Sequence, residues 1–132
     1  MIVDTAGLVW SLVVHPAGVQ GNDRPAAGEA MWRLARRQWA PRLRLMWCDS
    51  AYRGMVNLWA RVLGPWRVEM VRRTDGTAGF TVEPKRWVVE RTFGWWNRYR
   101  RLSKDYERDP DSSRAMILIA MINLMARRLR PG

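Results

Sequence analysis

Two carboxylates, Asp49 and Glu90, stand at positions where acid side chains could do chemistry. Asp49 ends RLRLMWCD (42–49), whose alternating apolar residues predict a strand, and SAYRG after it predicts a turn into a helix. Carboxylates at strand ends of an α/β sheet face the crevice where ligands bind. Glu90 is the one acid in KRWVVERTFGWWNRYRR (85–101), a stretch rich in cations and tryptophans.

A helical wheel at about 100° per residue places Glu90 on a polar stripe. The opposite stripe is apolar and predicts the face turned to the core; it comprises Val88, Trp95, Tyr99 and Leu102. The residues within roughly 40° of Glu90 are small, polar or basic; they are Arg86, Gly94, Asn97, Arg101 and Lys104. We therefore expect the acid to face away from the core. Trp87 is also expected in the core, with stacking on DNA bases as the alternative.

The pair of acids is typical of two-metal phosphoryl transfer. Mg²⁺ or Mn²⁺ prefers oxygen ligands, and two such ions about 3.5–4 Å apart can activate an attacking oxygen and stabilise a leaving one. Asp49 and Glu90 are the predicted metal ligands and catalytic residues. Two structural alternatives stay open: Asp49 could cap a helix, and Glu90 could pair with Arg86 on a solvated surface.

The charge of the chain points to an anionic partner. Its 132 residues carry a formal net charge of +11 and a pI of about 11.4, which favours a nucleic acid, although a membrane surface or an acidic protein would fit the same charge. We expect the basic and polar residues around Glu90 to hold the DNA backbone; they are Lys85, Arg86, Asn97, Arg98, Arg100, Arg101 and Lys104. The single cysteine, Cys48, excludes an intrachain disulfide and a cysteine metal cluster.

No membrane segment is expected. The longest apolar run, AMILIAMINLMA (115–126), is too short to cross a bilayer, and the N-terminus lacks a signal-peptide pattern, so we expect a cytoplasmic protein.

These residues must be positioned by an α/β domain. In the first half of the chain, periodicity and turn residues predict a hairpin (2–4 and 8–14), a helix capped by Asn22 or Asp23, and a strand (42–49). A helix stopped by Gly64 and Pro65, a strand (66–73) and an extended piece (80–84) are predicted next. The last two predicted elements are a helix from about 85 to 102 and a helix from about 112 to 129 that is capped by Asp111 or Ser112. Strands alternating with helices imply a mixed sheet covered by helices.

Three segments resemble the DDE transposases of bacterial insertion sequences, in the branch typified by insertion sequence five. CDSAYRG (48–54) resembles the family's motif around its second catalytic aspartate, and WVVERTFGWWNRYRRLSKDYER (87–108) is similar to the segment with the catalytic glutamate. IVDTAGLVWSLVVHPAGVQ (2–20) is similar to the family's hairpin. The resemblance implies a ribonuclease-H-like fold, divalent metal ions, Asp49 as the second acid and Glu90 as the third.

The chain departs from the family pattern in two ways. A related signature of sister transposases has a tyrosine and a lysine where this chain has Glu83 and Asn97, while Arg86 matches the family's arginine before the glutamate. The family's first aspartate lies upstream of the hairpin, and Asp4 matches a hairpin-turn aspartate instead. We therefore interpret residues 1–132 as a single partial catalytic domain, the C-terminal part, lacking its first strand and the N-terminal DNA-binding region.

The expected function is metal-dependent DNA cleavage and strand transfer at insertion-sequence ends, in a bacterial cytoplasm and on the nucleoid when bound. The expected partner is double-stranded DNA at transposon ends and target. We also expect the chain to form a homodimer or to associate with an N-terminal transposase product. Because one acid is missing, an inactive DNA-binding remnant is an alternative, and so is an unrelated basic nucleic-acid-binding protein.

Overall fold

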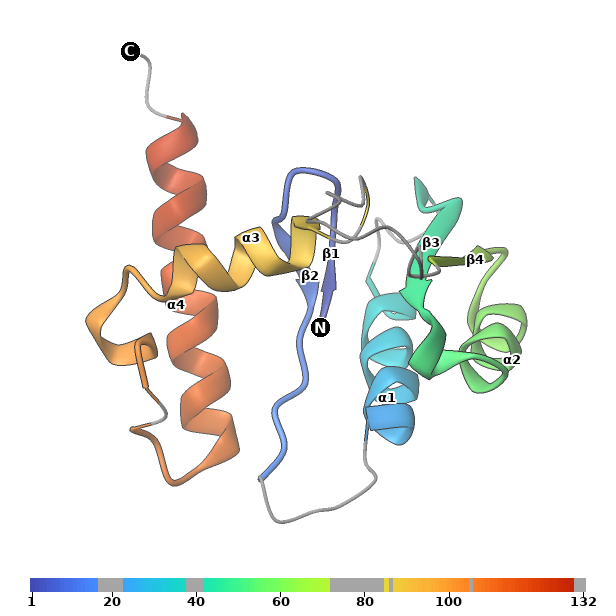
Figure 1. Ribbon diagram of the computed structural model, residues 1–132, viewed down its shortest axis with the longest axis horizontal. Helices are drawn as coiled ribbons and strands as arrows, with labels where there is room; N and C mark the ends of the chain where they lie inside the picture. Colours follow the sequence, from blue (N-terminus) through green and yellow to red (C-terminus); the bar gives the residue numbers. More distant parts are fainter. Residues whose placement is uncertain (17–22, 38–41, 72–84, 86, 105, 130–132) are drawn as a thin grey trace, which may run out of the picture.

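The computed structural model of the chain describes residues 1–16, 23–37, 42–71, 85, 87–104 and 106–129. Four α-helices and two small sheets make up this part of the chain (Figure 1). One sheet is antiparallel and the other parallel. The prediction of an α/β fold is therefore confirmed. The extended piece predicted at 80–84 lies outside the described residues.

The N-terminal hairpin pairs β1 (Ile2–Val3) with β2 (Val9–Ser11). Its turn is held by Asp4, whose backbone N–H donates to the Leu8 carbonyl at 2.9 Å and whose Oδ1 accepts from the Leu8 N–H at 2.8 Å. Gly7 closes the turn with a φ of +80°, a conformation that side chains disfavour. The hairpin is confirmed, with Asp4 as its turn residue, although β2 is shorter than predicted.

The second sheet is a parallel β–α–β unit. β3 (Leu45–Asp49) pairs in register with β4 (Arg67–Val71), from Leu45 opposite Arg67 to Asp49 opposite Val71. The connection is η2 (Ser50–Tyr52) and α2 (Met55–Leu63), since parallel strands need a crossover. Helix α1 (Asp23–Ala35) packs beside this unit. Their shared core is formed by Met31, Leu34, Met46, Val56, Ala60 and Trp66.

The C-terminal part folds on the other side of the hairpin (Figure 1). It comprises α3 (Trp87–Trp96), η3 (Arg100–Leu102) and α4 (Pro110–Leu129). Leu12 from the hairpin side, Trp96 and Met121 form a second buried cluster, in which the indole Nε1 of Trp96 donates to the Met121 sulfur at 3.3 Å. α3 is thereby held between the hairpin and α4.

Two predicted helix boundaries are wrong. The helix expected to reach Leu102 ends at Trp96, because the chain tightens into short-range bonds (Tyr99 N–H to the Trp96 carbonyl, 2.8 Å) and Tyr99 then takes an extended backbone. α4 is capped by Asp109, which accepts from the Asp111 N–H at 3.3 Å, rather than by Asp111 or Ser112. Pro110 follows as its first residue, the position that proline favours.

Candidate functional site

Asp49 lies at the C-terminal end of β3, as predicted, and its side chain is exposed. Its Oδ1 accepts from the Ala51 N–H at 3.4 Å and from the Ser50 hydroxyl at 3.1 Å. Asp49 therefore caps η2, which confirms the capping interpretation. The same carboxylate stands at the open end of the parallel sheet, where ligands bind in α/β folds.

Glu90 lies in the first turn of α3 and is exposed. The opposite face of α3 is anchored by Thr92, which is fully buried, and Trp96. The prediction that Glu90 faces away from the core is confirmed. Arg86 lies outside the described residues, so a pair between Arg86 and Glu90 stays a prediction.

The buried side of α3 docks on the hairpin turn. The Thr92 hydroxyl lies 2.8 Å from the Gly7 carbonyl oxygen and 3.0 Å from that of Val88, and the Arg91 guanidinium donates to the Thr5 carbonyl at 3.2 Å. A Cβ on Gly7 would come within 2.9 Å of both Thr92 Oγ1 and the Trp95 ring. This close contact fixes the rotation of α3 about its axis, and with it the direction in which Glu90 points.

Arginine and tryptophan side chains alternate along the rim of α3. The Arg91 guanidinium lies over the Trp87 ring at 4.2 Å and over Trp95 at 5.0 Å, and Arg128 of α4 covers Trp95 at 4.4 Å. Trp87 is 39% exposed, so its predicted place in the core is wrong, and Trp95 is only partly buried. Their rings gain cation–π contacts from the guanidinium groups.

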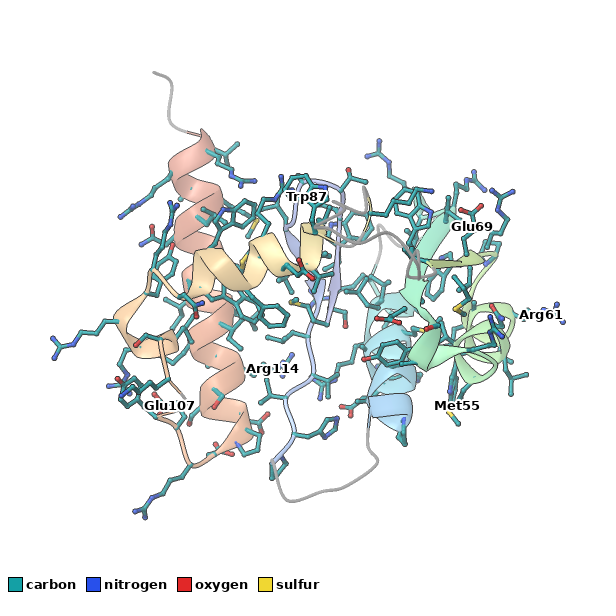
Figure 2. All side chains as sticks on the ribbon, in the orientation of Figure 1. Met55, Arg61, Glu69, Trp87, Glu107 and Arg114 are labelled. Carbon is teal, nitrogen blue, oxygen red and sulfur yellow. The ribbon has the colours of Figure 1, made fainter. Side chains whose placement is uncertain are left out.

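Lys85 connects the sheet that bears Asp49 with the chain leading into α3. Its ammonium lies 4.5 Å from the centroid of the Trp47 ring and 3.9 Å from a Glu69 carboxylate oxygen. Glu69 also accepts from the Trp47 indole at 3.0 Å and from Arg67 at 2.6 Å, and the indole bond is the main cause that lowers the pKa of Glu69. Figure 2 shows Glu69 on the β3–β4 sheet and Trp87 at the start of α3. Lys85 therefore already contacts an acid and a ring in the free chain.

The other predicted DNA-binding residues follow α3. Asn97, Arg98, Arg100 and Lys104 are exposed, and Arg101 pairs with Glu107. Because α3 ends at Trp96, Arg101 and Lys104 do not share a helical stripe with Glu90, and that part of the wheel prediction is wrong. These residues form a basic extension beyond the helix end.

Sequence reasoning missed three residues that organise this region. Thr92 and Gly7 are far apart in the sequence, and a polar threonine gives no apolar signal. Glu69 sits in a strand whose pattern identifies its apolar residues only. The one sequence signal was Gly7 itself, which lies between the two predicted strands of the hairpin, since a positive φ favours glycine.

The described residues include carboxylates that could bind a metal ion, but no group of three candidate ligands. Asp49 and Glu90 supply the carboxylate oxygens that Mg²⁺ and Mn²⁺ prefer, but no three or more His, Cys, Asp or Glu side chains gather into a metal-binding group in the part of the chain that the structure describes. Burial raises the pKa of the neighbouring Cys48 thiol to about 11, so this thiol is protonated at neutral pH in the metal-free chain.

Among the described helices, none combines the length and apolar composition needed to cross a bilayer.

Comparison with known families identifies the chain. A family model described as "Transposase DDE domain" matches residues 1–125. Comparisons with curated proteins and with solved structures gave no match. Since the model covers nearly the whole chain, including both carboxylates and the hairpin, this protein belongs to the transposase DDE domain family.

Proposed function

We propose that this chain supplies Asp49 and Glu90 to the metal-dependent site of an insertion-sequence transposase of the insertion-sequence-five-like branch. Membership of the transposase DDE domain family indicates DNA transposition and a DNA substrate. The observation that carries the assignment of Glu90 is the docking of α3: Thr92 is buried against the Gly7 carbonyl, and Glu90 is exposed on the opposite side.

The fold gives a reason to expect a further strand. The antiparallel β1–β2 hairpin and the parallel β3–β4 pair share no strand in the described part of the chain. A ribonuclease-H-like mixed sheet would join such pairs through a strand that bears the first aspartate. We therefore propose that residues 1–132 form a partial catalytic domain, completed by an acid-bearing strand.

Binding and chemistry are divided between two sets of residues. Bound Mg²⁺ or Mn²⁺ would activate the attacking oxygen and stabilise the leaving one. Asp49 and Glu90 would hold the ions, and the phosphate backbone would be bound by Lys85, Arg86, Asn97, Arg98, Arg100, Arg101 and Lys104. To bind phosphate, Lys85 must leave its ion pair with Glu69, and Arg101 must leave its ion pair with Glu107. Arginine is suited to such exchange because its planar group matches phosphate geometry.

A catalytically inactive DNA-binding remnant is the second candidate. It is favoured by the lack of a three-ligand group within the described residues. The family match excludes the alternative of an unrelated basic nucleic-acid-binding protein. The first proposal also includes a bacterial cytoplasmic location, and either a homodimer of this chain or its association with an N-terminal transposase product.

The test compares two proteins on a duplex that carries an insertion-sequence end: the 132-residue chain and a version extended upstream through the acidic strand. We expect Mg²⁺-dependent nicking by the extended protein and little by the shorter chain. Asp49→Asn should abolish nicking by the extended protein, whereas Glu29→Gln, which changes a part-buried pair with Arg33 on α1, should not. Unchanged nicking after Asp49→Asn would overturn the assignment.

A binding experiment separates the two sets of residues. Arg98→Ala with Arg100→Ala should weaken duplex binding and reduce its salt dependence by about one unit of slope per lost phosphate contact. Arg37→Ala with Arg61→Ala, which removes two exposed arginines outside α3, is the matched control (Figure 2 labels Arg61). An equal loss in the control would show that total charge alone drives binding.

A further inference from the structure

Helix α4 carries two apolar faces, and the fold covers only one of them. Its inner face packs on the hairpin side and α3 through the buried Met121, with Ile117 and Leu124 beside it, and Ala120 next to Met121 is buried too. Its outer face is also apolar but exposed: Ile119 is 58%, Ile122 61% and Leu129 83% exposed. A surface helix needs only one apolar face, so the second one calls for a partner.

The outer face follows the heptad spacing of a coiled coil. Its members recur at alternating intervals of four and three residues; they are Ala115, Ile119, Ile122, Ala126 and Leu129, and all are exposed. At about 100° per residue this row lies roughly 160° around the helix from the inner face. A repeat of 3.5 residues presents a straight seam to another helix, which makes a helix the fitting occupant.

We propose that this outer row is the interface for the α4 helix of a second copy of this chain, packed antiparallel. The first four members of the row, Ala115, Ile119, Ile122 and Ala126, read the same in both directions. In an antiparallel pair Ile119 faces the partner copy's Ile122, and Ala115 faces the partner copy's Ala126. The same layers repeat on the other side of a two-fold axis, as an isologous interface requires.

The charges at the two ends of α4 favour this direction. The C-terminal end carries Arg127 and Arg128, whereas at the N-terminal end Asp109 and Asp111 are balanced by Arg108 and Arg114. Antiparallel packing keeps the two basic ends apart and opposes the two helix dipoles. Parallel packing would place the two basic ends side by side.

The chemistry of the row disfavours other classes of partner. Residues 115–126 contain no charged side chain. A phosphate backbone would therefore find no cation along the row, and a membrane-surface helix would carry Lys and Arg along its polar face. An uncharged apolar row between charged ends fits a second helix of the same kind.

Sedimentation velocity of the whole chain tests the proposal. We expect a concentration-dependent dimer that Ile119→Glu with Ile122→Glu weakens at least about 100-fold, since both substitutions place a charge in the central layers. The matched control is Leu58→Glu with Val62→Glu, which changes two α2 residues that are 63% and 68% exposed. Circular dichroism should show unchanged helix content in both variants, because glutamate is a good helix former.

Two results would overturn the proposal: a wild-type chain that stays monomeric up to about 100 μM, or a dimer that the α4 variant leaves intact. Salt gives an independent readout. Each copy carries +11, so added salt should strengthen self-association by screening repulsion, whereas it weakens DNA binding.

Disulfide trapping tests the direction. Ala115→Cys and Ala126→Cys chains should form disulfides when mixed and little when each is alone. Disulfides within each variant alone, and fewer in the mixture, would show parallel packing and refute the antiparallel pair. The wild-type chain is the background control, because burial raises the pKa of the Cys48 thiol and keeps it protonated at neutral pH.

Discussion

Gly7→Ala is expected to destabilise the chain by disturbing the contact between the hairpin turn and α3. Gly7 has a φ of +80°, which costs an alanine about 1–2 kcal/mol. Its new Cβ would also lie 2.9 Å from Thr92 Oγ1 and from the Trp95 ring, and overpacking of this kind costs about 1–3 kcal/mol. The two terms together give a loss of roughly 2–5 kcal/mol in the free energy of unfolding.

Gly54→Ala is the matched control for this prediction. Gly54 also has a positive φ, +89°, but a Cβ there would meet nothing within 4 Å. Its ψ of −68° lies outside the left-handed helical region, so an alanine there should lose about 1–3 kcal/mol through backbone strain, without the crowding cost. Urea unfolding followed by circular dichroism measures both values, with the midpoint compared at a constant m-value. Equal losses in the two variants would refute the tight packing of α3 on the turn.

Three further predictions concern single side chains. Thr92→Val should cost about 1–3 kcal/mol in urea unfolding because the Gly7 carbonyl loses its hydroxyl partner; Thr92→Ser should recover most of this, and no recovery would assign the loss to packing. Trp47→Phe should raise the pKa of Glu69 in an NMR titration, because the hydrogen bond from the Trp47 indole is the main cause that lowers this pKa. In the wild type the stabilisation from this bond is fully present above the ordinary carboxyl pKa of 4.5 and is lost as the pH falls through the depressed pKa. An unchanged titration of Glu69 would contradict the bond. Cys48 should react slowly with a thiol reagent at pH 8 and quickly after unfolding, since burial raises its pKa to about 11; fast reaction of the folded chain would contradict that burial.

Local patterns were enough to predict the strand, helix and strand of the β–α–β unit, although not the parallel pairing of its two strands. The alternation that ends at Asp49 marked β3, and Gly64 with Pro65 marked the end of α2. The exposed direction of Glu90 also followed from helical periodicity alone, because the wheel depends only on residues close to it in the chain.

The remaining features depend on contacts between distant residues. Thr92 is buried because a carbonyl 85 positions away accepts its hydroxyl, and no local pattern contains that partner. The end of α3 at Trp96 coincides with the anchoring of that indole on Met121 of α4. Trp87 was assigned to the core as an apolar residue, but the Arg91 guanidinium gives its ring a stable place at the surface.

The most direct test of the central claim is the Mg²⁺-dependent cleavage rate of an insertion-sequence-end duplex by the upstream-extended protein carrying Glu90→Gln. We predict that cleavage falls at least about 100-fold, as expected for loss of a metal ligand. Duplex affinity should stay within a few fold of wild type, because the acid binds metal and the cations bind DNA. A Glu90→Gln protein that cleaves at the wild-type rate would contradict the assignment of Glu90.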